Sequence, residues 1–405
     1  MIDTDLFQMA LGLTSPWQVR ACEFDPEKKQ LDIQIDFPKG STFSCPECGL
    51  VGCKAYDTTD KKWKHLNFFQ HETYLHARVP RVDCKDCGIK TVNVPWARPG
   101  SGFTLLFEAL VMAMGKEMTP NAVGRIINEH DTRIWRILRH YVDQARSEAD
   151  YSAVTSIGID ETASKRGHNY VSVIMDLNER KVLFAIANRD NTVVKAFKKD
   201  LIEHGGDPTK IKNACCDMSP AYIKGITETF PQAEITFDRF HIMKILNEAV
   251  DKVRRDEQID NHALKGTRYV WLKNEKNLKS TQRSMLRWMK ISQLNSKTMR
   301  AYNIRLTFQE FYNQSPEDAE VFLKKWYFWA THSRLKPIRQ AAYTVRNHWE
   351  GVLNWHKSKI NNGLLEGINS LIQAAKAKAR GYRSTRNLIT MIYMIAGKLN
   401  FNLPT

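Results

Sequence analysis

Residues 156–237 alternate between strand-like and helix-like patterns, and their order constrains the fold more than any other part of the chain. Short apolar runs bounded by polar turns predict strands, and apolar residues at three- and four-residue spacing predict helices. The predicted strands are residues 156–161, 170–175, 182–187, 211–216 and 234–237, and the predicted helices are 193–202 and 219–230. The order is therefore β-β-β-α-β-α-β, beginning with an antiparallel meander.

Carboxylates stand where these strands end. Asp160 closes the first strand and Asp217 follows the fourth, an arrangement that resembles a ribonuclease-H-like core. Cutting or joining phosphodiesters uses two hard divalent cations about 3.5–4 Å apart, and Mg²⁺ prefers carboxylate oxygens. Neighbouring strands can hold two such acids together, and a third must come from elsewhere. Glu161 and Asp238 also stand at strand ends, and we interpret them as supporting residues; Asp238 would replace Asp217 only if the strand order were different.

Composition narrows the class of partner. A chain of 405 residues predicts two to four folding units, and its net charge of +16 indicates a polyanionic partner, most simply nucleic acid. Because no stretch approaches about 18 apolar residues, we expect no membrane span. The N-terminus carries acids where a signal peptide has basic residues, so we expect a cytoplasmic, nucleoid-associated protein with reduced cysteines.

Two Cys-x-x-Cys-Gly motifs predict a metal site in the N-terminal region. Their thiolates form the tetrahedral set that structural Zn²⁺ prefers and leave no position for water. The four ligands are Cys45, Cys48, Cys84 and Cys87. Residues 49–83 separate the pairs, a longer gap than the usual about 15–20 residues, and an extra hairpin that includes 73–79 would fill it.

Other residues near these motifs offer alternatives. The two motifs could be coincidental turns with reduced cysteines. His65, His71 and His76 could substitute as ligands, although packing or exposure is the simpler interpretation, and Cys53 is a weaker ligand candidate. Cys22, Cys215 and Cys216 lie in apolar strand patterns and are most simply buried thiols.

Three helices are predicted after the Pro- and Gly-rich boundary at 95–100. They begin near Leu105, Thr119 and Asp131, and the last presents basic side chains outward: Arg133, Arg136 and Arg139. The positions expected to face inward are Leu105, Leu106, Leu110, Val111, Met114, Ala122, Val123, Ile126, Ile127, Ile134, Trp135, Leu138 and Tyr141. This pattern predicts a helix-turn-helix whose last helix enters the major groove; the alternative is a helical linker with solvated arginines.

The C-terminal part contains two helical regions. Residues 241–355 are helical in pattern and rich in tryptophan, which we expect to be mostly core, with one or two rings available to stack on an unpaired base. After Asn361-Asn362-Gly363 a new helix begins. Five residues at three- and four-residue steps would share one of its faces: Glu366, Asn369, Gln373, Lys376 and Arg380. Glu366 would supply the third acid, and the alternative is an ordinary surface helix.

The combined motifs resemble the ISL3 family of bacterial insertion-sequence DDE transposases along nearly the whole chain. The matching residues are the twin Cys-x-x-Cys-Gly motifs, Gly158-Ile159-Asp160-Glu161, Cys216-Asp217-Met218 with Tyr222, Asp238-Arg239-Phe240-His241, Asn362-Gly363-Leu364-Leu365-Glu366-Gly367-Ile368-Asn369 and Gly381-Tyr382-Arg383. One departure is Gln373, where the family pattern has a basic residue.

The resemblance implies an α+β multidomain fold with a zinc ribbon, a helix-turn-helix and a ribonuclease-H-like mixed-sheet core interrupted by an all-helical insertion. The expected segments are residues 1–100, 101–150, 151–243, 244–355 and 356–405. Asp160, Asp217 and Glu366 are the implied catalytic triad, holding Mg²⁺ or Mn²⁺. Arg133, Arg136, Arg139, Asn369, Lys376 and Arg380 are the expected DNA contacts.

The expected reaction is metal-dependent cleavage at the ends of an insertion sequence, followed by attack of the freed 3′ hydroxyl on target DNA. The partners would be double-stranded DNA, as terminal inverted repeats and as target, and a second copy of the chain in a synaptic homodimer. Two alternatives stay open at this point. One is a zinc and helix-turn-helix repressor with an inactive nuclease fold, and the other is a nuclease that never joins ends.

Overall fold

The computed structural model describes residues 3–165, 169–188, 190–292, 296–359 and 363–403. The chain forms two compact units, Met1–Ala145 with Asn400–Thr405, and Arg146–Leu399. The five-segment division expected from the sequence stays a prediction beside these two units. Asn361 and Asn362, where a helix break was expected, lie outside the described residues.

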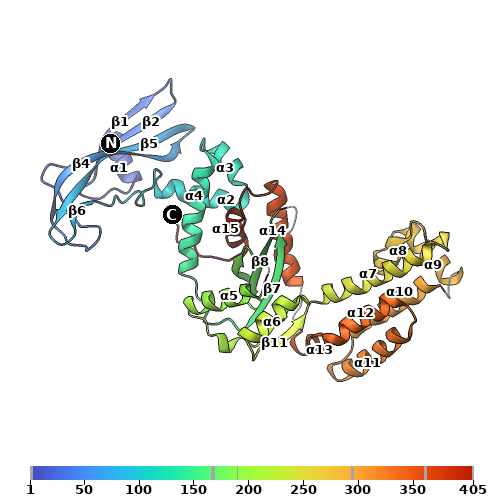
Figure 1. Cartoon of the computed structure of the whole chain (residues 1–405). Coiled ribbons are helices and arrows are strands. Elements are labelled where there is room, and N and C mark those ends of the chain that lie inside the picture. Colours follow the sequence, from blue (N-terminus) through green and yellow to red (C-terminus); the bar gives the residue numbers. More distant parts are fainter. Residues whose placement is uncertain (1–2, 166–168, 189, 293–295, 360–362, 404–405) are drawn as a thin grey trace. The chain divides into compact units, whose positions relative to one another are not determined.

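The N-terminal unit begins with a mixed sheet in the order β1-β2-β5-β4-β3, with β6 on β5 (Figure 1). Its elements are α1 (Asp3–Ala10), β1 (Gln18–Asp25), β2 (Gln30–Asp36), β3 (Thr42–Phe43), β4 (Cys53–Phe68), β5 (His71–Cys84) and β6 (Gly88–Thr91). The long hairpin β4–β5 fills the gap between the cysteine motifs, as predicted. Trp17, Trp63 and Trp96 pack edge-to-face in the core beneath it.

Three helices complete this unit: α2 (Leu105–Glu117), α3 (Pro120–Ile126) and α4 (Asp131–Ser147). Thr119 caps α3 by accepting a hydrogen bond from the Ala122 N–H. The tight turn to α4 requires a glycine, because a Cβ on Gly124 would lie 2.4 Å from the Glu129 carbonyl oxygen. The chain therefore forms the predicted helix-turn-helix.

Of the 13 predicted apolar positions of these helices, seven are buried, four are half-buried and two are exposed. Ile134, Leu138 and Tyr141 are buried as expected. Leu110 is 41% exposed and Ile126 is 61% exposed, so the prediction that they face inward was wrong. Ile126 is the last residue of a short helix, where periodicity carries little information about the facing side.

The second unit contains a five-stranded sheet in the order β11-β10-β7-β8-β9. Its strands are β7 (Ser156–Ala163), β8 (Tyr170–Asp176), β9 (Lys181–Ile186), β10 (Asn213–Cys216) and β11 (Glu234–Phe237). The meander β7-β8-β9 is antiparallel, and β10 runs parallel to both β7 and β11. The predicted order β-β-β-α-β-α-β is confirmed. Strand β7, however, continues three residues beyond Asp160, so the prediction that this acid closes the strand was wrong.

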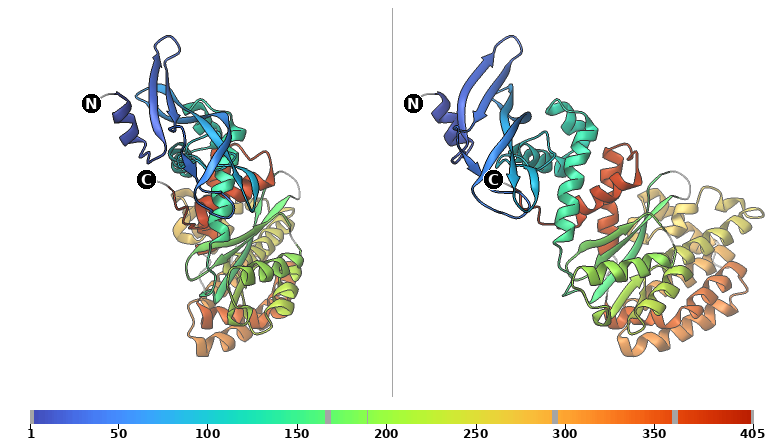
Figure 2. Two further views of the ribbon diagram at one scale, coloured as in Figure 1. Left: turned by 90° about the vertical axis from the view of Figure 1, so that its left-hand side faces the viewer. Right: turned by 60° about the vertical axis from the view of Figure 1, so that its left-hand side comes forward.

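Helices cover both faces of this sheet (Figures 1 and 2). On one face lie α5 (Thr192–Glu203) and α6 (Pro220–Thr229), which pack together where Gly225 meets Val194. On the other lie α14 (Gly363–Lys378) and α15 (Thr385–Ala396), whose Tyr393 hydroxyl accepts a hydrogen bond from the Ala185 N–H of β9. A short 3₁₀ turn, Pro208–Lys210, precedes β10.

The predicted helical insertion begins directly after β11, where the Asp238 side chain caps α7 through the Phe240 N–H. It contains α7 (Arg239–Gln258), α8 (Arg268–Leu272), α9 (Ser280–Ser292), α10 (Lys297–Phe311), α11 (Pro316–His332), α12 (Lys336–Asn347) and α13 (Trp349–Ser358), with 3₁₀ turns at His262–Leu264 and Glu275–Asn277. One buried apolar cluster runs from the sheet into these helices. Trp271 and Trp326 lie within it as expected, whereas Trp288 is 53% exposed and Trp329 is 43% exposed.

Candidate functional site

Helix α14 lies along strand β7 and brings polar groups from distant parts of the chain together. Successive strand residues point to opposite faces, and Asp160 and Thr162 share the face toward α14. The Asn369 side-chain N–H₂ donates to Asp160 Oδ2, and Gln373 donates to the Thr162 hydroxyl. One turn further on, Lys376 Nζ donates to the Ala163 carbonyl at 2.6 Å. The polar face predicted for this helix is therefore directed at β7.

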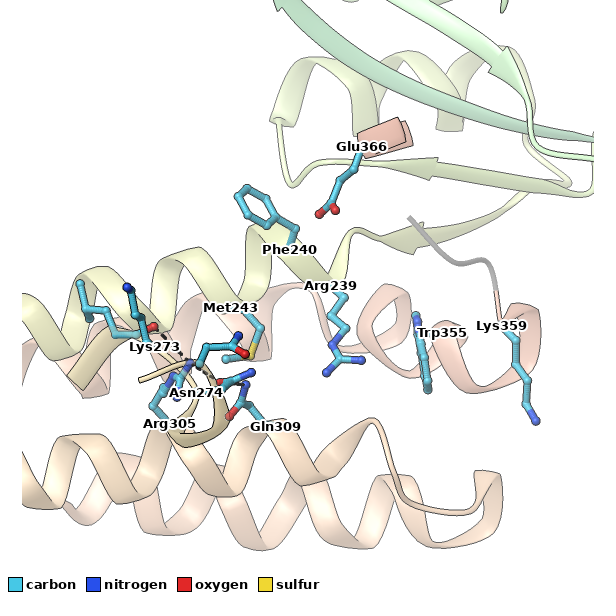
Figure 3. Close-up of a pocket in the computed structure, with 12 residues that line it drawn as sticks. Arg239, Phe240, Met243, Lys273, Asn274, Arg305, Gln309, Trp355, Lys359 and Glu366 are labelled. Carbon is cyan, nitrogen blue, oxygen red and sulfur yellow. Dashed lines mark hydrogen bonds between the residues drawn. The ribbon is translucent and has the colours of Figure 1, made fainter. Parts of the chain in front are cut away.

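Glu366 lies one turn before Asn369 on the same helix, at the spacing that places side chains on a common face. The start of the helix is fixed by Leu365, which packs so closely on Gly158 that a Cβ there would lie 2.7 Å from a Leu365 methyl carbon. Glu366 is exposed and lines a pocket together with Arg239 and Phe240 (Figure 3). The helix thus carries the third predicted acid to the Asp160 end of the sheet.

Asp217 directly follows β10, the strand next to the one that carries Asp160. Strand β10 ends at Cys216, and Cys215 is paired with Gly158 of the parallel strand β7. Continuing that register by two residues sets Asp217 opposite Asp160. Its Oδ1 atom accepts a hydrogen bond from the Ser219 N–H at 2.9 Å, which orients the carboxylate at the start of α6.

Asp238 occupies the corresponding place after the edge strand β11. Its carboxylate is buried at 4% exposure, caps α7 and has His241 Nε2 3.7 Å away. Because β10, not β11, is the neighbour of β7, the condition under which Asp238 would replace Asp217 is not met. Asp238 is therefore a further carboxylate near Asp160, on the β11 side of Asp217.

Burial and like charge act together on Asp160. The pKa of Asp160 is raised to about 6, chiefly by burial and in smaller part by the nearby carboxylates of Asp238 and Asp217. The Glu161 N–H and the charge of His241 act in the opposite direction. Carboxylates this close repel one another, and a hard divalent cation bound to their oxygens would remove that repulsion. Each His, Cys, Asp or Glu side chain could offer one ligand atom to a metal ion. Among the described residues, three or more of these atoms lie within 4.8 Å of one another only at a group of cysteines. Asp160, Asp217 and Glu366 therefore do not form a closed ligand group in this structure.

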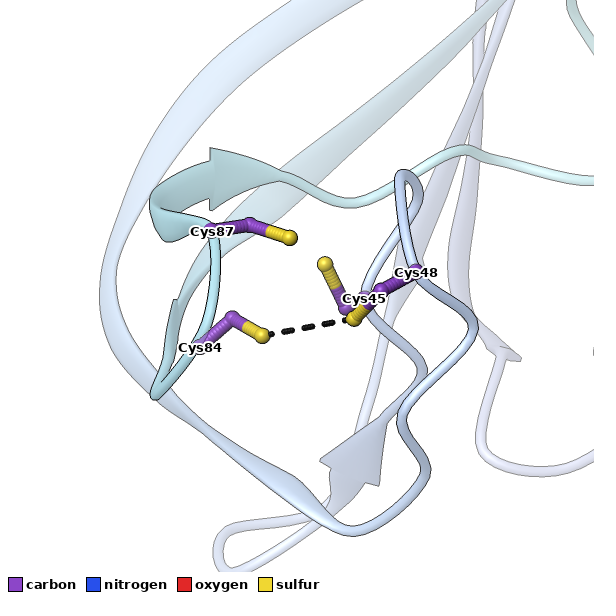
Figure 4. A group of neighbouring side chains, drawn as sticks. All are labelled: Cys45, Cys48, Cys84 and Cys87. Carbon is purple, nitrogen blue, oxygen red and sulfur yellow. Dashed lines mark hydrogen bonds between the residues drawn. The ribbon is translucent and has the colours of Figure 1, made fainter.

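That group of cysteines consists of the four predicted residues, Cys45, Cys48, Cys84 and Cys87 (Figure 4). Cys48 Sγ lies 3.5 Å from Cys84 Sγ, close to the about 3.8 Å between sulfurs that share one tetrahedral zinc with bonds of about 2.3 Å. The glycine after each pair has positive φ, +74° at Gly49 and +72° at Gly88, a conformation that favours glycine.

The thiols of this group differ in acidity. Of the alternative ligands, the three histidines have other partners, whereas Cys53 lies beside Cys45 and Cys84. Hydrogen bonds from the Cys48 and Glu47 N–H groups lower the pKa of Cys45 to about 7, whereas hydrogen bonding with Cys48 and burial raise the pKa of Cys87 to about 12. Among the alternatives, His65 bonds with Thr104, His76 with Asp32, His71 packs on Phe24, and Cys53 donates to the Leu50 carbonyl. Cys215 and Cys216 are buried thiols as predicted, and Cys22 is half-buried.

The basic residues predicted to bind DNA differ in their exposure to solvent and in their contacts within the fold. Arg136 is exposed on α4 and Arg139 is half-buried. Arg133 pairs with Glu129 at 2.6 Å and covers the Phe103 ring, so it is partly committed to the fold. Arg380 lies beyond the last residue of α14 with φ +54°, so the prediction that it continues the helix face was wrong.

Comparison with known proteins agrees with this architecture. Residues 157–392, more than half of the chain, match the DDE-type ISL3 family described as "Transposase". The chain belongs to the ISL3 family of transposases. Residues 92–142 of this transposase match the helix-turn-helix domain of transposase family ISL3, and residues 41–87 match the zinc-finger of transposases IS204, IS1001, IS1096 and IS1165. The predicted family, fold class and DDE transposase activity, with DNA cleavage and strand transfer, are confirmed.

Two relatives extend over nearly the full length of this transposase. A transposase for insertion sequence element IS1001 from Bordetella parapertussis is 26% identical over 399 residues, 95% of this chain and 96% of that protein. A transposase for insertion sequence element IS1557 from Mycobacterium tuberculosis (strain CDC 1551 / Oshkosh) is 26% identical over 446 aligned positions, 100% of this chain and 98% of that protein. None of the described helices combines the length and apolarity needed to cross a membrane.

One feature of the site was not predicted. Asn369 and Lys376 were expected to contact DNA, but both donate hydrogen bonds to β7. Periodicity identified the face that they share without identifying what it faces. The alternation of Asp160 and Thr162 in register with Asn369 and Gln373 was the available signal.

Proposed function

We propose that this transposase cuts the ends of its own insertion sequence with Asp160, Asp217 and Glu366 and joins the freed 3′ hydroxyls to target DNA. The observation that supports this assignment is the hydrogen bond from Asn369 to Asp160. It ties α14 to β7 one helical turn from Glu366, which supports the proposal that three acids distant in sequence act together at one end of the sheet. The carboxylate set fits Mg²⁺ or Mn²⁺.

Divalent ions bound to these acids would supply positive charge at the attacking and leaving oxygens. The chain's own groups prepare the acids for that role. The Glu161 N–H and the Asn369 amide each donate to one oxygen of Asp160 and so fix its orientation. The Ser219 N–H does the same for Asp217. Asn369 is thus proposed as a positioning residue, and direct contact of Asn369 or Lys376 with DNA stays a prediction.

The N-terminal unit is proposed to recognise the element ends. Zn²⁺ held by the four cysteines would fix the ends of the β4–β5 hairpin, and the exposed Arg136 of α4 would meet the terminal inverted repeats. Arg133, Arg139 and Arg380 are proposed as further DNA contacts. Pairing of two ends requires two active sites, so we propose a homodimer in the synaptic complex.

Cleavage assays test this proposal. Labelled duplexes carrying the DNA that flanks the coding region are incubated with the protein, Mg²⁺ and a target plasmid. We expect cut and joined products from the wild type, and retained end binding without cutting from Asp160→Asn, Asp217→Asn and Glu366→Gln. Asp207→Asn is the matched control, because this half-buried acid caps a 3₁₀ turn and its substitution should leave cutting unchanged.

Each outcome decides between functions. Binding without any cleavage by the wild type would leave a DNA-binding repressor, and cleavage without joined product would leave a nuclease. Persistent cutting by one of the three variants would remove that residue from the site.

A further inference from the structure

Beside the acids lies a pocket of about 620 Å³ between the sheet and the helical insertion. Its volume is within the range of about 300–1,000 Å³ that is typical of small-molecule sites. Glu366 lies at one side, Phe240 and Arg239 project from the start of α7, and Arg305 and Trp355 line the side formed by the insertion (Figure 3). The pocket therefore adjoins the site where DNA would be cut.

The charge of the pocket is strongly positive. Among the described residues that line it, Glu366 is the only carboxylate. The cations that line it are Arg239, Lys273, Arg305 and Lys359. A site with this balance attracts an anion.

Arg305 is the most informative of these cations. Its side chain is 3% exposed, and its hydrogen bonds go to neutral groups, Asn247 Oδ1 at 3.0 Å, Asn274 Oδ1 at 3.1 Å and the Leu272 carbonyl at 3.5 Å. Nη1 is buried without a hydrogen-bond partner among the described residues. An arginine keeps its charge in proteins, and a buried charge without a counter-charge is costly. An anionic group of a ligand would compensate it.

Aromatic rings accompany the cations. Phe240 lines the pocket and is 55% exposed, so its ring is accessible to a ligand. Trp355 is held edge-to-face against Tyr312, and the guanidinium of Arg239 lies over the same Tyr312 ring at 4.5 Å. Flat apolar rings next to cations suit a ligand with both a planar base and a phosphate.

We propose that this pocket binds one unpaired nucleotide of the DNA strand being cut, extruded from the duplex beside the cleavage point. The base would stack on Phe240 and Trp355, and a phosphate would approach Arg239 and Arg305. Extrusion opens the duplex next to Glu366 and holds the scissile strand at the acids. The inference rests on the proposed cutting at Asp160, Asp217 and Glu366, and it adds the conformation of the substrate.

The test combines a protein substitution with a DNA substitution. Phe240→Ala removes the stacking surface, and Phe328→Ala is the control, because Phe328 is a 63% exposed aromatic of the same insertion that does not line the pocket. Element ends are prepared fully paired or with an abasic site at successive positions beside the cut. We expect Phe240→Ala to cut paired ends about 5- to 150-fold more slowly, equivalent to about 1–3 kcal/mol of stacking, and Phe328→Ala to cut normally.

The abasic substrates decide the interpretation. At the extruded position the base is absent, so wild type and Phe240→Ala should cut at equal rates, whereas a structural defect would persist on every substrate. Equal rates of Phe240→Ala and Phe328→Ala on paired ends would overturn the pocket assignment and leave the cutting activity intact.

A second measurement does not depend on catalysis. Ends carrying 5-iodouracil at the same positions are irradiated in complex with Asp217→Asn protein, and the cross-linked peptides are identified. Cross-links from one position to peptides containing Phe240 or Trp355 are expected. Cross-links elsewhere would overturn the proposal, even if the wild type proved unable to cut DNA.

Discussion

Lys64 is predicted to hold the helix-turn-helix against the N-terminal sheet. It is a strand residue, yet its side chain is 3% exposed. Its ammonium group lies 2.9 Å from a Glu72 oxygen and 3.4 Å from a Glu129 oxygen, and it donates to the Ile127 and Asn128 carbonyls at 3.0 and 3.3 Å. Three of these partners belong to the turn between α3 and α4. The substitution Lys64→Met keeps the apolar stem and removes only the charge and the donors.

The contacts of Lys64 determine how much stability Lys64→Met should lose. Removing one partner of a buried ion pair costs about 3–5 kcal/mol, because the other charge stays buried. Here both acids keep a second partner, since Glu129 pairs with Arg133 at 2.6 Å and Glu72 accepts from Asn128 at 2.8 Å. We therefore expect the lower end of the range, about 3 kcal/mol.

Amide hydrogen exchange on the full-length protein measures this loss where it occurs. Peptides covering β4, β5 and α3–α4 should exchange faster in Lys64→Met by an amount equivalent to about 3 kcal/mol of opening free energy, and binding to element ends should weaken. Lys62→Met is the matched control: Lys62 is 45% exposed and 3.8 Å from Asp32, so it should cost less than about 1 kcal/mol. Equal protection in the two variants would refute the reasoning.

Three further predictions concern the same unit. Burial lowers the pKa of His65 to about 4. The unfolded chain binds this proton near pH 6.5 and the folded chain only near pH 4, so the free energy of unfolding should fall by about 2–3 kcal/mol between pH 7.5 and 4.5. Urea unfolding of His65→Gln should lack that part of the pH dependence. Gly124→Ala should destabilise the helix-turn-helix by about 1–3 kcal/mol, because the new Cβ would clash with the Glu129 carbonyl. Gly367→Ala is the control, because a Cβ there meets nothing within 4 Å, and it should not destabilise the protein. Equal melting temperatures of the two variants would contradict this prediction. Elemental analysis should find one zinc per chain, absent in Cys84→Ser and retained in Cys22→Ser; zinc retained by Cys84→Ser would rule out the four-cysteine site.

Local patterns predicted most elements of this fold. The apolar run at 170–175, the Thr119-Pro120 cap and the glycines after each cysteine pair act within a few residues, so their physical effect can be predicted from the sequence. That Asp160 and Asp217 belong to neighbouring strands was also predictable, although Asp160 lies within β7 and only Asp217 follows its strand, β10.

Partners across the fold could not be predicted in the same way. Lys64 stands between Trp63 and His65 in a strand with several other lysines, and nothing local in the sequence indicates that its charge is buried. The periodicity of α14 predicted one polar face, but not that Asn369 would donate to Asp160 rather than to DNA. Arg380 fitted the same periodicity, yet the helix ends before it. In the sequence Arg305 is one of many basic helix residues, and its neutral partners, Asn247 and Asn274, are far from it in the chain.

The central claim is that Asp160, Asp217 and Glu366 hold metal together, and iron-mediated backbone cleavage tests it most directly. Fe²⁺ replaces Mg²⁺, and peroxide with ascorbate generates radicals that cut the peptide chain beside the bound ion. The claim predicts cuts near residues 160, 217 and 366 in one protein, suppressed by excess Mg²⁺ and lost in Glu366→Gln. Cuts near 160 and 217 that persist unchanged in Glu366→Gln, with none near 366, would contradict it.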